Sequence, residues 1–230
     1  MSNPWFEHLA VFDLETTGID VETSRIVSAH VGVIDANGEL VERHDWLADP
    51  GIEIPLGASA VHGITTERAR AEGRPADLVV EEIIAALNDV FARGLAVTIY
   101  NAPYDLTLLH REALRYEVTP LHEPAPIIDP LVLDKVLDRY RKGKRTLEAA
   151  AEFYGVALTE AHDASADAVA AGRVAQALAA RYPAEMVIES AILHASQIGW
   201  ASDSAASFQD YMRRTRDPEF VARGTWPIHP

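Results

Sequence analysis

Two carboxylates lie two positions apart where a buried strand is expected to end. Residues 9–12 form an apolar run, and Asp13 and Glu15 follow it closely. Because residues i and i+2 of a strand point to the same side, the two side chains should project together. Like charges that close repel, and a divalent cation such as Mg²⁺, which takes oxygen ligands, would relieve the repulsion. The alternative is a strand end followed by a solvated Thr-Thr-Gly turn.

A third carboxylate, Asp105, follows another short apolar run. Asn101 stands at the expected junction between a strand over residues 96–100 and a helix over residues 102–116, and Asp105 lies further along that helix. Positions i and i+4 share a helix face, so Asp105 can point back to the end of the strand. The plainer interpretation is that Asn101 caps the helix and Asp105 lies at the positive end of its dipole.

A histidine and a fourth carboxylate come late in the chain. His162 precedes an Ala-rich helix expected over residues 163–181, which Asp163 can cap, and Asp167 lies inside its first turns. A carboxylate on the packed face of a helix is costly unless it is paired or binds a metal ion. Four carboxylates can hold two divalent ions about 3.5–4 Å apart, as phosphoryl transfer requires, and a histidine can take a proton from water.

Together these segments resemble the three exonuclease motifs of the DEDDh, or DnaQ-like, family. The segments are Asp-Leu-Glu-Thr-Thr-Gly at 13–18, Asn-Ala-Pro-Tyr-Asp at 101–105 and His-Asp-Ala-Ser-Ala-Asp at 162–167. Val-His-Gly-Ile-Thr at 61–65 also resembles a family segment, and the likeness covers roughly residues 8–180. The family includes the proofreading (epsilon) subunit of the bacterial replicative polymerase, RNase T and oligoribonuclease.

The resemblance implies a metal site with a general base. Asp13, Glu15, Asp105 and Asp167 would hold two Mg²⁺ ions, with Mn²⁺ also active, and His162 would be the base. One ion, with the base, would activate water for attack on the last phosphodiester, and the other would stabilise the leaving 3′ oxygen.

The resemblance also implies where the substrate lies. Leu14 and Thr16 would hold the terminal nucleotide, and we place His62, Asn101 and Tyr104 in the same binding site. Tyr104 stands where many members of the family carry Phe, a mild departure that does not touch the metal site.

The implied function is a 3′→5′ exonuclease that releases nucleoside 5′-monophosphates from single-stranded 3′ ends. DNA is the preferred substrate, as in proofreading or repair, and a DNA polymerase is a possible partner. The alternative substrates are RNA 3′ ends or short oligoribonucleotides. A non-catalytic adaptor is a further alternative, and the intact acidic motifs argue against it. The order of the motifs argues against a phosphatase or nuclease of another fold.

Helices and short apolar strands alternate after an initial meander, which predicts an α/β fold. We expect strands at 9–12, 25–34, 40–47, 96–100 and 126–129, with a hairpin at Asn37-Gly38 and an irregular loop at 55–62. Helices are expected at 67–71, 75–93, 102–116, 130–139, 147–154, 163–181, 185–198 and 204–214. By the resemblance, residues 1–182 form a ribonuclease H-like exonuclease domain with a mixed five-stranded sheet, and residues 183–230 form a helical C-terminal extension.

Composition limits the other classes. The chain has 230 residues, 48% of them hydrophobic, which suits one sizeable domain. It has no cysteine, and it shows neither a signal pattern nor an apolar run that could cross a membrane, so we expect a cytoplasmic protein without a membrane partner.

The net charge of −15 makes the chain a poor general binder of nucleic acid, so positive charge must be local or supplied by metal ions. The densest basic segment spans residues 135–145, and within it we expect Lys142, Lys144 and Arg145 to contact substrate phosphates. A second basic cluster, at residues 213–223, is interpreted as solvated.

Overall fold

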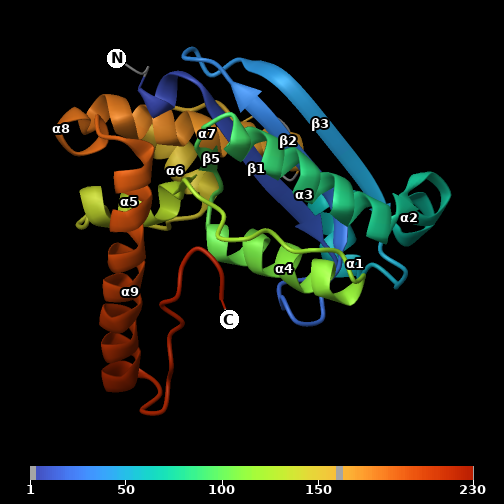
Figure 1. Ribbon diagram of the computed structural model, residues 1–230. Coiled ribbons are helices and arrows are strands. Elements are labelled where there is room, and N and C mark those ends of the chain that lie inside the picture. The colour runs from blue at the N-terminus through green and yellow to red at the C-terminus, as the bar shows by residue number, and fades with distance from the viewer. Residues whose placement is uncertain (1–3, 159–162, 230) are drawn as a thin grey trace.

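The computed structural model describes residues 4–158 and 163–229, which form a mixed sheet with helices on both faces (Figure 1). The strand order is β4-β3-β2-β1-β5-β6. The strands are β1 (Leu9–Thr16), β2 (Ile26–Ile34), β3 (Leu40–Asp49), β4 (Arg74–Pro75), β5 (Val97–Thr98) and β6 (Ile127–Ile128). The predicted α/β class is confirmed, and the sheet has one strand more than the five expected. The extra strand, β4, is a two-residue pairing at the edge of β3, too short to leave a pattern in the sequence.

Strands β1 to β3 form the antiparallel meander that the sequence predicts, and β5 and β6 run parallel to β1. The turn between β2 and β3 is the predicted hairpin. The Asp35 carboxylate accepts hydrogen bonds from the backbone N–H groups of Asn37 and Glu39, each at 2.9 Å. Gly38 adopts φ 75°, a conformation that glycine accepts without a steric cost.

The two faces of β1 belong to different hydrophobic clusters. Ala10, Phe12 and Leu14 pack with α3 (Ala76–Ala92) and α4 (Ala102–Arg115). Leu9 and Val11 pack with α6 (Leu147–Tyr154) and α7 (Ala164–Arg181). The alternation of side chains along the strand therefore places Asp13 and Glu15 on the face of the sheet that α7 covers.

Helix α7 approaches the sheet closely because it carries a glycine where the two surfaces meet. A Cβ atom at Gly172 would lie 2.6 Å from Cγ1 of Val11 and 2.7 Å from Cδ1 of Ile34. The same helix begins at the predicted cap, since the Asp163 carboxylate accepts from the N–H groups of Ser165 and Ala166. Close packing and a fixed first turn together bring the start of α7 to the end of β1.

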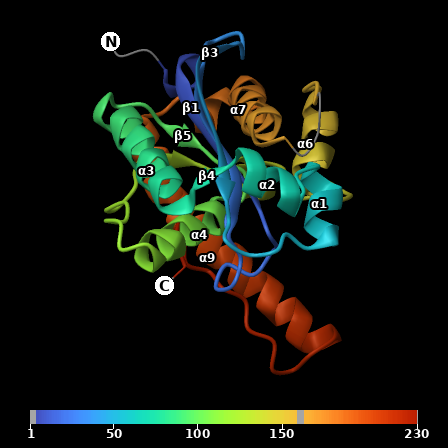
Figure 2. The same cartoon turned by 90° about the vertical axis from the view of Figure 1, so that its right-hand side faces the viewer.

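The remaining helices lie around the sheet or, like α9, project from it (Figure 2). They are the 3₁₀ helix Trp5–Glu7, α1 (Leu56–His62), α2 (Thr66–Glu72), α5 (Pro130–Leu137), α8 (Pro183–Met186) and α9 (Ser190–Thr215). Thr65 and Thr146 cap α2 and α6 with their side chains. The irregular loop predicted at 55–62 is wrong, because α1 occupies it. Helix α1 buries no residue and has no side-chain cap, so it leaves no periodic signal.

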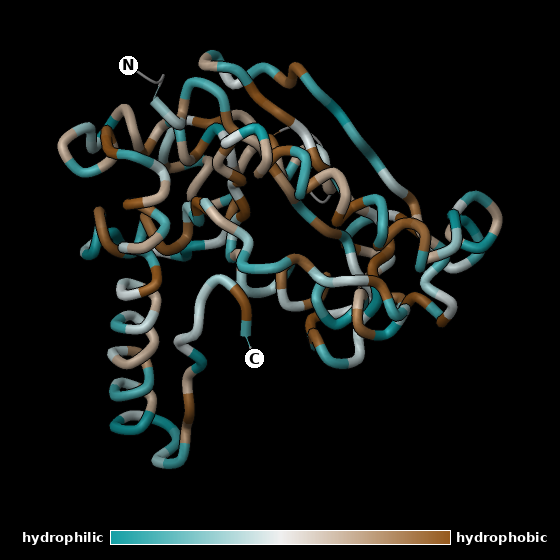
Figure 3. The backbone as a smooth tube through the Cα atoms, viewed as in Figure 1, coloured by the Kyte–Doolittle hydropathy of each residue, from teal (hydrophilic) through white to brown (hydrophobic). Residues whose placement is uncertain are grey.

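The predicted break between helices at 185–198 and 204–214 is also wrong. A single helix of 26 residues, α9, runs through Gly199 and projects beyond the sheet (Figures 1 and 2). A glycine inside a helix costs about 1 kcal/mol, and Trp200, which packs against both main clusters, offsets this cost. In Figure 3 hydrophobic colours dominate the inner strands, whereas hydrophilic colours return repeatedly along the projecting part of α9. In the described parts of the chain, no helix combines the length and apolarity that crossing a membrane requires.

Side chains of α9 cover the open edge of β6. Nδ1 of His194 accepts from the Ile127 N–H at 3.0 Å. The amide of Gln197, which is 0% exposed, donates to the Ile127 carbonyl at 2.9 Å and accepts from the Asp129 N–H at 2.8 Å. An exposed strand edge has unpaired N–H and C=O groups that can pair with another chain and cause aggregation. Because α9 bonds to these groups of β6, the C-terminal extension completes the sheet.

We expect Gln197→Ala to destabilise the protein by roughly 2–4 kcal/mol, because it leaves two buried backbone groups without partners. Chemical denaturation followed by circular dichroism measures this loss. Ser196→Ala is the matched control, since the Ser196 hydroxyl donates only within its own helix, to the Ile192 carbonyl. Equal midpoints for the two variants would contradict a structural role for Gln197.

Candidate active site

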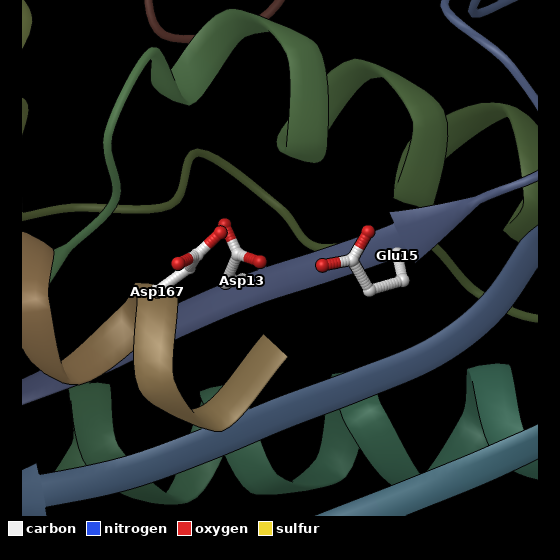
Figure 4. A group of neighbouring side chains, drawn as sticks. All are labelled: Asp13, Glu15 and Asp167. Atoms are coloured by element: carbon white, nitrogen blue, oxygen red, sulfur yellow. The ribbon is translucent and has the colours of Figure 1, made fainter. Parts of the chain in front are cut away.

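Three carboxylates meet at the end of β1 (Figure 4). Asp13 and Glu15 project from the strand, and Asp167 reaches them from the first turns of α7. One oxygen of each lies within 4.8 Å of the others, which is close enough for a single cation to contact all three. The structure therefore brings together the residues that the sequence places on a common strand face and on a later helix.

Asp105, the fourth predicted carboxylate, adjoins this group from the other side of β1. It lies in the first turn of α4 and is 3% exposed. Burial raises the pKa of Asp105 well above its usual value, although a hydrogen bond from the Leu14 backbone, between the two acidic residues of β1, acts in the opposite direction. The charge of Asp105 in turn raises the pKa of Asp13. Asp105 thus interacts electrostatically with Asp13, but its oxygens are not among those of Asp13, Glu15 and Asp167 that lie within 4.8 Å of one another.

Burial and the charges of neighbouring carboxylates raise the pKa values in this group. Burial, and then the charges of Asp105, Glu15 and Asp167, raise the pKa of Asp13 well above its usual value. Burial, with the charges of Asp167 and Asp163, raises the pKa of Glu15 to about 8. A divalent cation would remove this repulsion, and the donors are all carboxylate oxygens, which suit Mg²⁺. The residues present therefore fit a magnesium-type ion.

This electrostatic strain predicts a pH-dependent stability in the absence of divalent ions. A carboxyl whose pKa is raised from 4.5 to about 8 contributes stability that is fully present below 4.5 and is lost as the pH rises through 8. We expect the melting temperature in chelator to fall between about pH 5 and about pH 8, and Mg²⁺ to reduce the fall. Glu15→Gln should flatten the profile, and Glu81→Gln, on the exposed face of α3, should not. A fall of the same size in both variants would contradict this assignment.

The turn after β1 is held by Tyr104. Its hydroxyl donates to the Gly18 carbonyl at 2.5 Å and lies 2.6 Å from the Thr16 hydroxyl, which itself donates to Gly18 at 2.8 Å. Burial raises the pKa of Tyr104 to about 12, so the phenol keeps its proton. The hydroxyl that Tyr104 has and Phe lacks therefore links α4 to the segment that contains Thr16. Thr16 is one of the two residues predicted to hold a terminal nucleotide.

A hollow of about 330 Å³ opens beside Glu15, toward β2 and β3. His62 lines it together with Trp46 and two arginines, Arg43 and Arg68. The His62 ring is oriented by the Ile64 N–H, which donates to Nδ1 at 3.2 Å. We name this space the Glu15 hollow. It places His62 beside one of the clustered carboxylates, whereas a role in substrate binding stays a prediction.

Asn101 does not cap α4 through its side chain. It adopts φ 65° and ψ 48°, in the left-handed region, and makes no capping hydrogen bond. Its conformation is fixed instead by Asp129, whose carboxylate accepts from the N–H groups of Asn101 and Ala102, each at 3.0 Å. The capping interpretation of Asn101 is thus wrong, because a carboxylate from the next strand supplies the acceptor.

Asp129 was not among the predicted site residues. It is 1% exposed and accepts four hydrogen bonds: the two named above, one from the Leu131 N–H at 3.0 Å and one from the indole N–H of Trp226 at 3.2 Å. The sequence did carry a signal, since Asp129 directly follows a short buried strand, as Asp13 does. Two of its donors, the N–H groups of Asn101 and Ala102, lie at the start of α4, so Asp129 fixes the start of the helix that carries Asp105.

We expect Asp129→Asn to lower activity by about 10–100-fold, as loss of a residue that orients a metal ligand does. The amide keeps the size of the carboxylate but turns one acceptor into a donor that faces N–H groups. The measurement is the Mg²⁺ concentration at half-maximal rate, which should rise, alongside direct Mn²⁺ binding by electron paramagnetic resonance. Asp138→Asn, after the end of α5, is the control. Unchanged Mn²⁺ affinity would contradict this positioning role.

The predicted phosphate contacts differ in their surroundings. The Arg145 guanidinium donates to the Asp134 carboxylate at 2.7 Å and to backbone carbonyls of Asp134 and Asp138, so it already has internal partners. Lys142 and Lys144 are exposed in the same loop. The substrate role of this loop stays a prediction, carried by the two lysines. His162, the predicted base, lies outside the described residues.

A mixed sheet whose central strand ends in clustered carboxylates is the architecture of ribonuclease H-like nucleases. The exonuclease family model RNase_T matches residues 10–175, which include all three predicted motifs. The chain belongs to this family, as a DnaQ-like exonuclease.

Known relatives and solved structures agree with this placement. A DNA polymerase III subunit epsilon-like protein of Rhodobacter capsulatus is 32% identical over 164 residues, covering 70% of this chain and 22% of the relative. A PolC-type DNA polymerase III of Streptococcus thermophilus is 28% identical over 165 residues, covering 71% of this chain and 10% of the relative. The chain thus spans less than a quarter of either protein.

The fold resembles that of E. coli exonuclease I, solved in complex with a dT13 oligonucleotide. The TM-score is 0.67 at 20% identity, over 77% of this chain and 42% of the other. At this identity the likeness concerns the fold, and it confirms the predicted ribonuclease H-like architecture.

Proposed function

We propose that this protein is a metal-dependent 3′→5′ exonuclease that releases nucleoside 5′-monophosphates from single-stranded DNA ends. The observation that carries the proposal is the group of Asp13, Glu15 and Asp167, whose oxygens lie within 4.8 Å of one another. DNA is favoured over RNA because the relatives are named as DNA polymerase III proteins and the similar structure holds a DNA oligonucleotide.

Each part of the site has a task in this reaction. Asp13, Glu15, Asp105 and Asp167 would hold two divalent ions, Mg²⁺ or Mn²⁺. When bound, such ions activate the attacking water and stabilise the charge on the leaving oxygen. His162 would take the proton of that water as general base.

The residues around Thr16 would select the chain end. Tyr104 holds the Thr16 turn in place, and the Glu15 hollow, with His62 in its wall, would take the terminal nucleoside. A pocket closed at this position would accept a free 3′-hydroxyl and would leave no path for a strand that continues. We also propose that residues 1–182 form the exonuclease domain and that residues 183–230 complete its edge. A DNA polymerase is a candidate partner.

The proposal is tested by digesting matched DNA and RNA strands with free or phosphorylated 3′ ends, with products separated by chromatography. We expect nucleoside 5′-monophosphates from DNA with a free 3′ end, in Mg²⁺ or Mn²⁺. Ca²⁺ should support little cleavage, because its looser coordination places the attacking water poorly.

Three results would overturn parts of the proposal. Internal fragments in place of mononucleotides would exclude an exonuclease, and full activity in excess chelator would exclude metal dependence. Faster digestion of RNA than of DNA would transfer the substrate to RNA 3′ ends or short oligoribonucleotides.

A further inference from the structure

A second hollow, of about 350 Å³, lies where the C-terminal extension meets the start of α4. Asn101 and Pro103 form one wall, α5 and α9 form others, and the returning segment of residues 220–229 closes it. Figure 1 shows this segment running back beside α9 toward α4. We name this space the C-terminal hollow. Its volume lies within the range of about 300–1,000 Å³ in which small ligands bind.

The wall of the C-terminal hollow combines cations with aromatic rings. Lys135 of α5 and Arg223 of the returning segment line it, as do Phe208 and Phe220. The two phenylalanine rings pack edge to face with centroids 5.4 Å apart, and Phe208 remains 50% exposed. A base can stack on such a ring and a phosphate can pair with such cations, which is how single-stranded nucleic acid is held without sequence preference.

The segment that forms much of the C-terminal hollow has a more even charge balance than the whole chain. The whole protein has 35 acidic against 20 basic residues, whereas residues 200–229 carry four of each. The carboxylate in the wall, Asp129, already accepts four N–H donors, which lower the cost of its charge. The electrostatic repulsion of a polyanion is therefore weaker at this hollow than over the rest of the surface.

In the strand order of the sheet, the two hollows lie on opposite sides of β1, the strand that carries Asp13 and Glu15. The Glu15 hollow is lined by residues of β2 and β3, and the C-terminal hollow by residues that follow β5 and β6. Strand β1, with Asp13 and Glu15, lies between these pairs. A nucleic acid strand with its terminal nucleoside in the first hollow and its last phosphodiester at the carboxylates would continue toward the second.

We propose that the C-terminal hollow binds the single strand upstream of the 3′ end, with a base against Phe208 and backbone phosphates on Lys135 and Arg223. This inference rests on the proposed function and adds the path of the substrate. It assigns the C-terminal extension a share in substrate binding that none of the three motifs provides.

Hydrogen bonds tie the returning segment to Asp129 and to α4, the helix that carries Asp105. The indole of Trp226 donates to Asp129, and the His229 N–H donates to the buried Thr107 hydroxyl of α4 at 2.9 Å. A Cβ atom at Gly224 would lie 3.2 Å from Cβ of Ala205, so the returning segment packs closely on α9. A strand bound in the hollow would therefore approach the carboxylates at a constant spacing.

The test is the double variant Lys135→Ala/Arg223→Ala, with Arg214→Ala as control. Arg214 lies on α9 but does not line the hollow, and its guanidinium donates to the Asp210 carbonyl of the same helix. Binding of a fluorescent oligothymidylate of about 12 nucleotides is measured by anisotropy in chelator, where no cleavage occurs, and KM is measured on this strand and on a dinucleotide.

We expect the double variant to weaken binding of the long strand several-fold and to raise its KM, while kcat on that strand and KM on the dinucleotide stay near wild type. The slope of log affinity against log salt should fall by about 0.7 for each phosphate that the variant no longer neutralises. The control should match wild type in all measurements. Circular dichroism checks that the variants are folded.

Unchanged affinity and salt slope in the double variant would overturn the inference, as would an equal loss for long strand and dinucleotide. Failure of the proposed function looks different. In that case the wild-type protein would release no mononucleotide from either substrate, whatever the anisotropy shows.

Discussion

Replacing Asp13 or Asp167 by asparagine should reduce mononucleotide release by more than about a hundredfold while the protein stays folded. Both side chains belong to the group whose oxygens lie within 4.8 Å, so each replacement would remove a proposed ligand of the charge-stabilising ions. Single-turnover cleavage of a labelled single strand in Mg²⁺ measures the loss. Direct Mn²⁺ binding shows whether the loss follows from weaker metal affinity.

The same replacements should raise stability in chelator. The pKa of Asp13 is raised by burial and by its acidic neighbours, so an uncharged asparagine removes a destabilising repulsion. Asp77→Asn is the matched control, because Asp77 lies exposed in the first turn of α3 and makes no part of the group. Near-normal cleavage by a folded Asp167→Asn variant would remove Asp167 from the metal site, and lower stability in chelator would contradict the electrostatic account.

The part of the site that could be predicted from the sequence depends on local periodicity. Asp13 and Glu15 share a face because a strand alternates with period two, and Asp105 lies one turn after a strand–helix junction. Asp163 caps α7 as its residue type indicates. These features arise within a few residues, so composition and spacing suffice to predict them.

The missed part depends on contacts between distant segments. Asp129 accepts hydrogen bonds from the N–H groups of Asn101 and Ala102, which lie 28 and 27 positions before it. The indole of Trp226, 97 positions after it, donates to the same carboxylate. A local pattern places Asp129 after a short buried strand, but it does not show that the carboxylate will accept from Asn101, Ala102 and Trp226, because these lie far along the chain. The left-handed conformation of Asn101 has the same origin, because the acceptor that stabilises it belongs to another strand.

Packing also overrode local signals in the C-terminal extension. The sequence predicts separate helices at 185–198 and 204–214, yet α9 is continuous because Trp200 packs against both main clusters and Gln197 bonds to the backbone of Ile127 and Asp129. The basic loop shows the opposite case. Arg145 has the charge of a phosphate ligand, but Asp134, eleven positions earlier, already pairs with it. Sequence alone does not distinguish a cation that binds substrate from one that neutralises an internal carboxylate.

Replacing His162 by alanine should lower kcat by about a hundredfold or more, with little change in substrate affinity, as loss of a general base does. The prediction comes from the third motif, in which His162 stands five positions before Asp167. Asp167, the other end of this motif, joins the carboxylate group in the structure.

The wild-type rate should rise with pH through the usual range of an imidazole, near about 6.5, and this step should vanish in the variant. Added imidazole should restore part of the rate, because a free base can enter the space left by the side chain. His122→Ala, in an exposed loop, is the control for general effects of losing a histidine. If His162→Ala keeps the pH step of the wild type and gains nothing from imidazole, another group takes the proton. The search would then begin at His62, which already lines the Glu15 hollow beside the carboxylates.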